Sequence, residues 1–293
     1  MRTRTLHYEA LAWRKTAMAS PLGRPPSANT VRAVSNFCRA IDAAGIRSKF
    51  VRLNLICGRN TQAMRTPLYR GASATGTQYG EIRDISVGLA GTDFSESTGL
   101  TGDGVSKAID TTLTLQLLAS AGLDYNNVHA SVYTRGTNHG SVFGGVDAAG
   151  IYNGNYGPSL DAGSGGYWSQ DAFSGYSDLS RYAYSSNSAS GHKYGQDNSG
   201  TLQYWTNGAN STLNATYGGS PTSYDITSDS TPIWFLAMWN SSETSIDYYE
   251  ETPIYGTGSL AAYSVGLPLG SDGAINAFYK AMQAFQTAMR RQV

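Results

Sequence analysis

The chain has 293 residues, enough for one large β domain or two smaller units, and its 21 basic and 21 acidic residues give no net formal charge. Glycine (34 residues) and tyrosine (20 residues) are abundant and charged residues make up only 14% of the chain, which is typical of short strands joined by tight turns and excludes a helical bundle or a disordered chain. No apolar run approaches the ~18 residues of a membrane span, and the basic start lacks the apolar core of a signal peptide, so we expect neither.

The charge is distributed unevenly along the chain. Residues 1–70 hold 13 of the 21 lysines and arginines but only two acids, Glu9 and Asp42. Two interpretations remain open. The basic end could sit on the acidic surface of a partner, or it could neutralise the acidic sheet of its own domain.

Residues 1–26 are polar and basic and end in the proline-rich stretch 21–26, which favours an extended path. We therefore predict an extended anchoring arm over 1–26. Its arginines alternate with leucines and aromatics, as in protein interfaces, and lack the dense basic runs of nucleic-acid arms. We expect this arm to bind a partner subunit and no nucleic acid, through Arg2, Arg4, Trp13, Arg14, Lys15 and Arg24.

A helix should follow, capped by Ser27 or Thr30 and ended by Gly45. One face carries apolar residues at steps of three and four: Val31, Val34, Phe37, Cys38 and Ile41. The alternating stretch 49–57 then predicts a strand. We expect this helix–strand segment, residues 27–80, to pack on the domain that follows.

Cys38 and Cys57 are the only two cysteines of the chain. They could pair, but two buried free thiols are the favoured interpretation. Two cysteines are too few for a cysteine-based metal site.

From about residue 80 the pattern is that of β-strands separated by turn residues such as Asn207-Gly208. The predicted strands are 107–112, 128–134, 141–147, 180–186, 201–206, 233–240 and 260–267. A closing helix is expected after Ser271 or Asp272, with Ile275, Phe278, Met282, Phe285 and Met289 on one face and Arg290 and Arg291 at its C-terminal end. Strands at this spacing without intervening helices predict a sandwich or jelly roll.

The order of these segments resembles a group of phage, prophage and bacterial proteins that end in a concanavalin-like (laminin-G-like) jelly roll. The segments that carry the resemblance are 43–46, 51–55, 99–104, 109–111, 128–133, 263–266, 278–279 and 284–288. It implies a mainly β protein: a concanavalin-like jelly-roll sandwich over 81–293, with an N-terminal arm and helix and a C-terminal helix. The stretch 99–104 would be a glycine-hinged hairpin leading into a sandwich strand.

The resemblance also implies a non-enzymatic virion structural protein, such as a decoration, fibre or tail-associated subunit. We expect it to be made in the host cytoplasm, to form a homo-oligomer and to contact other virion subunits through the arm. A carbohydrate-binding lectin module and a polysaccharide hydrolase or lyase remain as alternatives.

Candidate catalytic groups are few. The carboxylates nearest to a glycosidase pair are Glu243, Asp247 and Glu251, but they do not reproduce the Glu-x-Asp-x-x-Glu strand pattern of the concanavalin-like glycosidases. The histidines lack metal-pair spacing, and no nucleophile elbow or phosphate loop is present. We predict no catalytic site, no cofactor and no metal, although Asp93, Glu96 and Asp103 could gather around calcium.

Aromatic residues give the better functional signal. Several lie among Gly, Ser and Asn in the loop-rich stretch 150–200, where flat rings suit a sugar or a protein surface. The candidate ligand-binding residues, for a host-surface glycan, are Tyr152, Tyr156, Tyr167, Trp168 and Tyr176. They could equally be packing residues of the sandwich.

Overall fold

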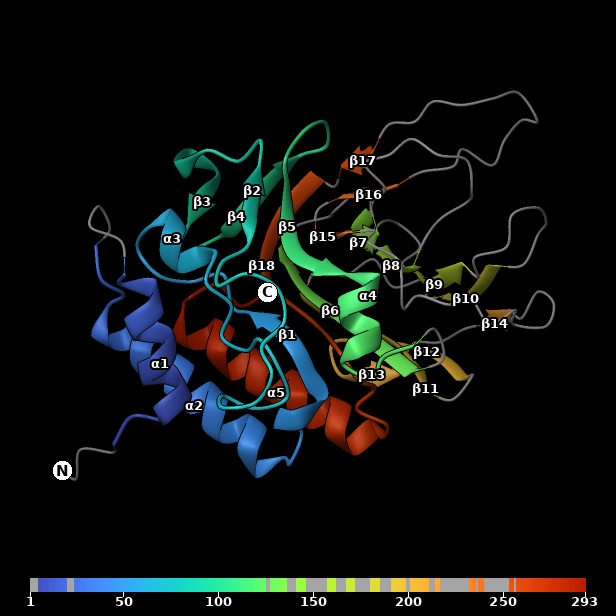
Figure 1. The fold of residues 1–293 in the computed structure, drawn as a ribbon, viewed down its shortest axis with the longest axis horizontal. Helices are drawn as coiled ribbons and strands as arrows, with labels where there is room; N and C mark the ends of the chain where they lie inside the picture. The colour runs from blue at the N-terminus through green and yellow to red at the C-terminus, as the bar shows by residue number, and fades with distance from the viewer. Residues whose placement is uncertain are drawn as a thin grey trace.

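Figure 1 shows the fold of the protein in a computed structural model. The described residues are 5–19, 24–124, 127–135, 141–145, 157–161, 167–171, 180–184, 191–198, 201–210, 214–216, 232–235, 237–239, 253–255 and 257–293.

The described chain is mainly antiparallel β-sheet with a few helices. The first sheet, here sheet A, has the strand order β13-β12-β11-β6-β18-β4-β3, and β1 also pairs with β18. Its strands are β1 (Phe50–Asn54), β3 (Phe94–Ser95), β4 (Gly99–Asp103), β6 (Asn127–Arg135), β11 (Gly191–Asn198), β12 (Thr201–Thr206), β13 (Ala209–Asn210) and β18 (Thr257–Gly266).

The second sheet, sheet B, has the order β14-β10-β9-β8-β7-β15-β5-β2. Its strands are β2 (Ile85–Val87), β5 (Ala108–Thr114), β7 (Ser141–Gly145), β8 (Gly157–Asp161), β9 (Tyr167–Asp171), β10 (Ser180–Tyr184), β14 (Asn214–Thr216) and β15 (Pro232–Phe235). A separate two-stranded ribbon joins β16 (Ala237–Trp239) to β17 (Pro253–Tyr255).

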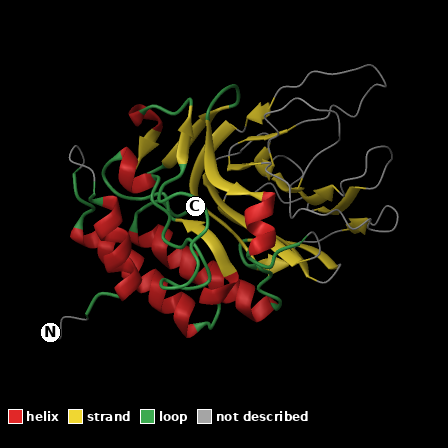
Figure 2. Cartoon of the chain, in the orientation of Figure 1, coloured by secondary structure: helices red, strands yellow, loops and turns green. Residues whose placement is uncertain are grey.

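Sheet A is covered on both faces, because its side chains alternate between two buried apolar clusters. In β6, Val128 and Val132 pack with residues of sheet B such as Ile109 and Phe235, whereas Tyr133 packs on the helical side. The helical side, at the lower left of Figure 2, consists mainly of α1 (Tyr8–Ala17), α2 (Ala28–Ala43) and α5 (Asp272–Ala288). The short helices are α3 (Thr61–Met64), α4 (Leu115–Ser120) and the 3-10 turns η1 (Arg47–Lys49) and η2 (Gly91–Asp93). None of the described helices is long and apolar enough to cross a bilayer.

The two predicted helices are confirmed. Ser27 caps α2 through its side chain and Gly45 follows the helix at φ +68°, a left-handed conformation that glycine adopts without strain. Every residue predicted for the apolar face of α2 is buried. Ser271 caps α5, and Phe278 and Phe285 of α5 pack edge-on against Phe37 of α2. The strand predicted at 49–57 is also present, as the shorter β1.

The extended conformation predicted for the arm is wrong for residues 8–17, which form α1. Ala10, Trp13 and Ala17 recur on one helical face and are buried against α2 and the rest of the helical layer. Alanine is only weakly apolar, so Ala10 and Ala17 give no clear helical pattern in the sequence. Trp13, the large residue of this face, is predicted from the sequence as a partner-binding residue. The segment is thus part of the domain rather than a free arm.

The hairpin predicted at 99–104 is also wrong. Gly99 and Gly102 lie in β4 of sheet A and Gly104 follows that strand, whereas the next strand, β5, belongs to sheet B, so the chain crosses between sheets here. Asp103 shapes the crossing, because its carboxylate accepts bonds from the backbone N–H groups of Val105, Ser106 and Lys107. These bonds hold the pKa of Asp103 far below its usual range. The predicted strand that follows is present.

The C-terminal end is anchored by Arg291, which is fully buried rather than exposed at the end of the helix dipole. Its guanidinium donates to the carbonyls of Ile56 (2.9 Å), Leu55 (2.6 Å) and Ala261 (2.9 Å). Burial lowers the pKa of Arg291 to about 10. The end of α5 is thereby tied to the chain after β1 and to β18.

Candidate functional site

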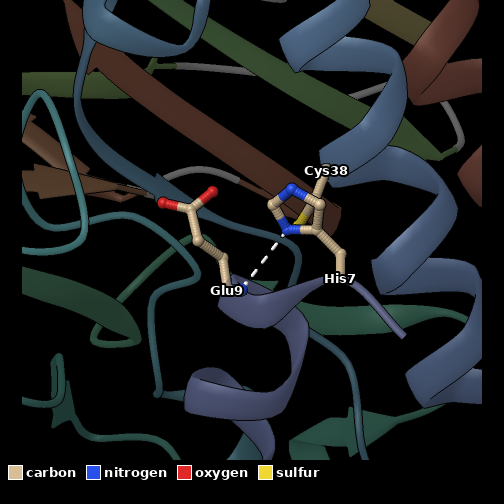
Figure 3. A group of neighbouring side chains, drawn as sticks. All are labelled: His7, Glu9 and Cys38. Carbon is tan, nitrogen blue, oxygen red and sulfur yellow. Dashed lines mark hydrogen bonds between the residues drawn. The ribbon is translucent and has the colours of Figure 1, made fainter. Parts of the chain in front are cut away.

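A cluster of three chemically reactive side chains lies where α1 meets α2. It contains His7, Glu9 and Cys38, whose ligand atoms all lie within 4.8 Å of one another (Figure 3). His7 and Glu9 come from the start of α1, and Cys38 comes from the buried face of α2. We call this group the α1–α2 cluster.

His7 is the N-cap residue of α1, a position that Ser, Thr, Asp or Asn usually occupies. Its Nδ1 accepts a bond from the backbone N–H of Glu9 at 3.3 Å. Its own backbone N–H donates to Ser35 Oγ on α2 at 2.8 Å. The bond to Ser35 fixes the start of α1 on α2, whereas the capping bond on Nδ1 is long.

The ring proton of His7 lies on Nε2, because Nδ1 is the acceptor of the capping bond. This Nε2–H donates to Asp42 Oδ2 at 2.8 Å, at the far end of α2. Asp42 is exposed, whereas most of the His7 side chain is covered. The hydrogen bond between His7 and Asp42 therefore keeps the lone pair of Nδ1 directed inward.

Glu9 is 3% exposed, which is unusual for a carboxylate. Arg47 Nε donates to its Oε1 at 2.8 Å, and the same guanidinium donates to Gly71 O and stacks 3.7 Å above the centre of the Tyr69 ring. Its other oxygen, Oε2, is buried without a hydrogen-bond partner among the residues that the structure describes. Burial raises the pKa of Glu9 above its ordinary value, although Arg47 acts to lower it.

Cys38 is fully buried and free, as the sequence predicted for both cysteines. Burial raises the pKa of the Cys38 thiol to about 12, so without a positive partner it is a thiol. The neighbouring Tyr69 hydroxyl acts to lower the pKa of Cys38, but burial dominates. In Figure 3 the sulfur lies next to the imidazole of His7, and the Glu9 carboxylate extends from the same turn of α1.

A second buried charged group lies between β1 and the chain before β2. The Asp84–Arg52 ion pair is fully buried, with Arg52 donating to Oδ1 from Nε (3.0 Å) and Nη2 (2.7 Å). Oδ2 accepts from Asn54 (2.7 Å) and from the Tyr263 hydroxyl (2.5 Å). Burial raises the pKa of Asp84, although all three neighbours act to lower it. We call this group the Asp84 cluster.

The arginines of residues 1–70 partly serve the chain itself. Besides Arg47 and Arg52, Arg39 donates to the carbonyl of Thr5 and Arg70 to that of Gly80. These bonds fix irregular backbone of the same domain. Internal use therefore accounts for part of the basic charge, and the exposed remainder lies on the surface of the helical side.

The residues predicted for the arm separate into two kinds. Trp13 is buried, and its indole N–H donates to Thr66 O at 3.0 Å, so its assignment to a partner surface is wrong. Arg14 and Lys15 are exposed on α1, and Arg24 is exposed after it. Arg2 and Arg4 lie outside the described residues.

The structure describes two of the five predicted glycan-binding aromatics. Tyr167 and Trp168 begin β9, whose backbone pairs with β8 and β10. Tyr152, Tyr156 and Tyr176 lie outside the described residues, as do Glu243, Asp247 and Glu251.

The three acids considered for calcium are engaged elsewhere. Asp93 forms an ion pair with Lys107 at 2.8 Å, Glu96 accepts from Thr30, and Asp103 shapes the turn between the sheets. Among the described residues they form no common group.

The α1–α2 cluster is not predicted from the sequence, because its residues form neither a standard histidine pair nor a cysteine set. His7 and Glu9 are two residues apart, and Cys38 was read as a core residue of α2. Only the docking of α1 on α2 brings the three together. A histidine and a glutamate at a helix start were the available signal, but α1 itself had not been predicted.

Comparisons with known proteins add little. No family model matches the sequence, and no curated protein matches it. One solved structure with partial similarity is described as a mutant of Trypanosoma rangeli sialidase displaying trans-sialidase activity. The identity is 9% and the TM-score 0.39, over 87% of this chain, and the chain spans only 39% of that structure's length.

Proposed function

We propose that the protein is a non-enzymatic structural subunit of a phage virion, a decoration, fibre or tail-associated protein, that attaches through its helical side. In this proposal the two sheets form a concanavalin-like jelly roll that projects from the particle. The support is the outer face of α1 together with the family resemblance of the sequence.

The outer face of α1 carries the single observation on which the proposal depends. Tyr8 and Leu11 of α1 and its C-cap residue Met18 are 58%, 43% and 45% exposed, although the other face of the helix is buried. With Lys15 they recur at steps of three and four and so form one stripe. Exposed apolar residues gathered on one helix face are typical of an interaction surface.

Several cations are exposed on α1 and on the segments that follow it. Arg14 and Lys15 belong to α1, and Arg24, Arg32 and Arg59 are exposed on neighbouring parts of the helical side. Arginine and tyrosine are enriched in protein interfaces. We therefore infer that the partner is a virion subunit with an acidic surface.

The position of the stripe suits an attachment surface. α1 lies on the opposite side of the molecule from strands β8, β9 and β10 in Figure 1. A particle bound to α1 would leave those strands directed away from it. The lectin alternative depends on tyrosines in and around β9, most of which lie outside the described residues.

The test is binding of the full chain to purified particles from which it has been stripped. Leu11→Glu combined with Met18→Glu should weaken attachment about tenfold or more, because it places two carboxylates in an apolar stripe. The matched control combines Ile82→Glu with Val105→Glu, which replace two exposed apolar residues outside the helices, and should bind as the wild type does.

Two results would overturn the proposal. One is unchanged attachment of the Leu11/Met18 variant while its circular dichroism matches the wild type. The other is release of sugar products from a polysaccharide by the purified protein, which would favour an enzyme.

A further inference from the structure

We propose that the α1–α2 cluster is a binding site for a zinc ion, with His7 Nδ1, Glu9 Oε2 and Cys38 Sγ as its protein ligands. The ion would fasten the start of α1 to α2.

The first argument is the unpartnered oxygen of Glu9. A buried carboxylate oxygen without a hydrogen bond is costly, and buried polar atoms nearly always have a partner. Arg47 satisfies Oε1 only. A cation held between Oε2 and its two neighbours would satisfy the orphaned atom and balance the buried charge.

The second argument is the orientation of His7. Histidines that bind metals usually donate their other ring N–H to a carboxylate, which fixes the tautomer and turns the free nitrogen toward the ion. The bond from His7 Nε2 to Asp42 has this form. Among the described residues Nδ1 takes part in one hydrogen bond, the 3.3 Å contact with the Glu9 amide, which is long and readily given up.

The third argument is the chemistry and spacing of the donors. A thiolate, an imidazole and a carboxylate together suit zinc, whereas calcium and magnesium prefer oxygen ligands alone. Ligand atoms around tetrahedral zinc lie roughly 3.5 Å apart. Here the ligand atoms of the three residues lie within 4.8 Å of one another. Side-chain rotations that move these atoms by roughly 1 Å would therefore bring them to the spacing of a zinc site.

The charges and protons balance. On binding, the Cys38 thiol releases its proton to solvent as the sulfur–zinc bond forms, while Glu9 binds as a carboxylate and His7 as a neutral ring. The thiolate and the Glu9 carboxylate then neutralise the two positive charges of the ion, and the Asp42 carboxylate bonded to His7 offsets the charge of Arg47. Arg47 keeps its bond to Oε1, and water takes the fourth position.

The experiment is a metal titration of the full chain after treatment with a chelator. Equilibrium dialysis against zinc measures the stoichiometry, and cobalt used as a substitute reports a sulfur ligand through its thiolate charge-transfer absorption. We expect one ion per chain and a thiolate band. Cys38→Ser should abolish the band and weaken zinc binding more than tenfold, and Glu9→Gln should weaken binding as well.

Cys57→Ser is the matched control, because Cys57 is an equally buried free thiol outside the cluster. It should keep both the stoichiometry and the band. Absence of zinc binding in the wild type would overturn the proposal, as would binding that survives Cys38→Ser. If Cys38→Ser fails to fold by circular dichroism, Glu9→Gln decides the question, and unchanged binding in that variant overturns the proposal.

Discussion

The Asp84 cluster and the α1–α2 cluster contain the same basic unit, a buried carboxylate paired with an arginine, but they differ in how far that unit is satisfied. Asp84 receives four hydrogen bonds, two on each oxygen. Glu9 receives one side-chain bond, on Oε1, and its other oxygen has no partner.

The difference follows from what the surrounding segments supply. Around Asp84, β1 supplies Arg52 and Asn54 and β18 supplies Tyr263, so three donors converge on one carboxylate. Around Glu9 the inward groups are Cys38 and the acceptor nitrogen of His7, which donate little. The first arrangement holds elements together by itself, whereas the second is completed by a cation.

Removing the charge of Asp84 should have the largest effect. Asp84→Asn leaves Arg52 buried without its counter-charge, so the free energy of unfolding should fall by about 3–5 kcal/mol. Urea unfolding followed by circular dichroism measures this loss. A loss as small as that of an exposed ion pair would show that water reaches Arg52 and that the cluster is open.

Two buried histidines outside both clusters should make the stability of the protein depend on acidic pH. His129 is fully buried, with Nδ1–H donating to Leu267 O and Nε2 accepting from Ser264, and burial lowers its pKa to about 4. His192, against Phe278 and Tyr279, has its pKa lowered by burial to about 3.

Both histidines stay neutral in the folded chain while the unfolded chain takes up protons below about pH 6.5. The contribution of the two histidines to stability should therefore be constant above that pH and fall between about pH 6.5 and pH 4, by about 3 kcal/mol for His129 alone. His129→Gln should flatten this slope in unfolding experiments across pH. An unchanged slope would assign the acid sensitivity to other groups.

Glu9→Gln, measured without metal, should cost less than Asp84→Asn. The glutamine oxygen can still accept from Arg47, and no carboxylate oxygen is then left unsatisfied, so we expect a loss of about 1–2 kcal/mol. The two variants are compared in the same urea experiment. A loss equal to that of Asp84→Asn would remove the distinction between the clusters.

Asp42→Asn should have the smallest effect on stability, because Asp42 is exposed. Its effect should appear in metal affinity, with a loss of about ten- to a hundredfold, since Asp42 orients the His7 ring. Zinc dialysis of this variant, beside Asp124→Asn as an exposed control far along the chain, separates orientation from general charge. Equal affinities in both variants would contradict the role of Asp42.

The sequence predicted those parts of the fold whose apolar residues repeat regularly. The faces of α2 and α5 were recovered residue by residue, and most predicted strands exist with shifted ends. It failed for α1, whose buried face is small apart from Trp13, and for residues 99–104, where strand pairing is decided by distant β18. Local patterns cannot reveal such pairings.

The candidate site could not be predicted from the sequence, for a related reason. Each of its three residues has an ordinary local explanation: His7 begins a helix, Glu9 belongs to its first turn, and Cys38 lies on an apolar face. Their meeting depends on the docking of α1. The unpartnered oxygen of Glu9 becomes visible only when burial and hydrogen bonds are known for the whole cluster.

The most direct test is the change in unfolding free energy when zinc is added. At a zinc concentration a hundredfold above its dissociation constant, the wild type should gain about 2.7 kcal/mol. Tyr263→Phe, which removes one bond from Asp84 but leaves its ion pair, should gain the same amount, and Glu9→Gln at that zinc concentration should gain clearly less. No gain in the wild type, or an equal gain in Glu9→Gln, would contradict the distinction between the two clusters. In that distinction, the Asp84 carboxylate is fully hydrogen-bonded and the α1–α2 cluster is completed by a cation.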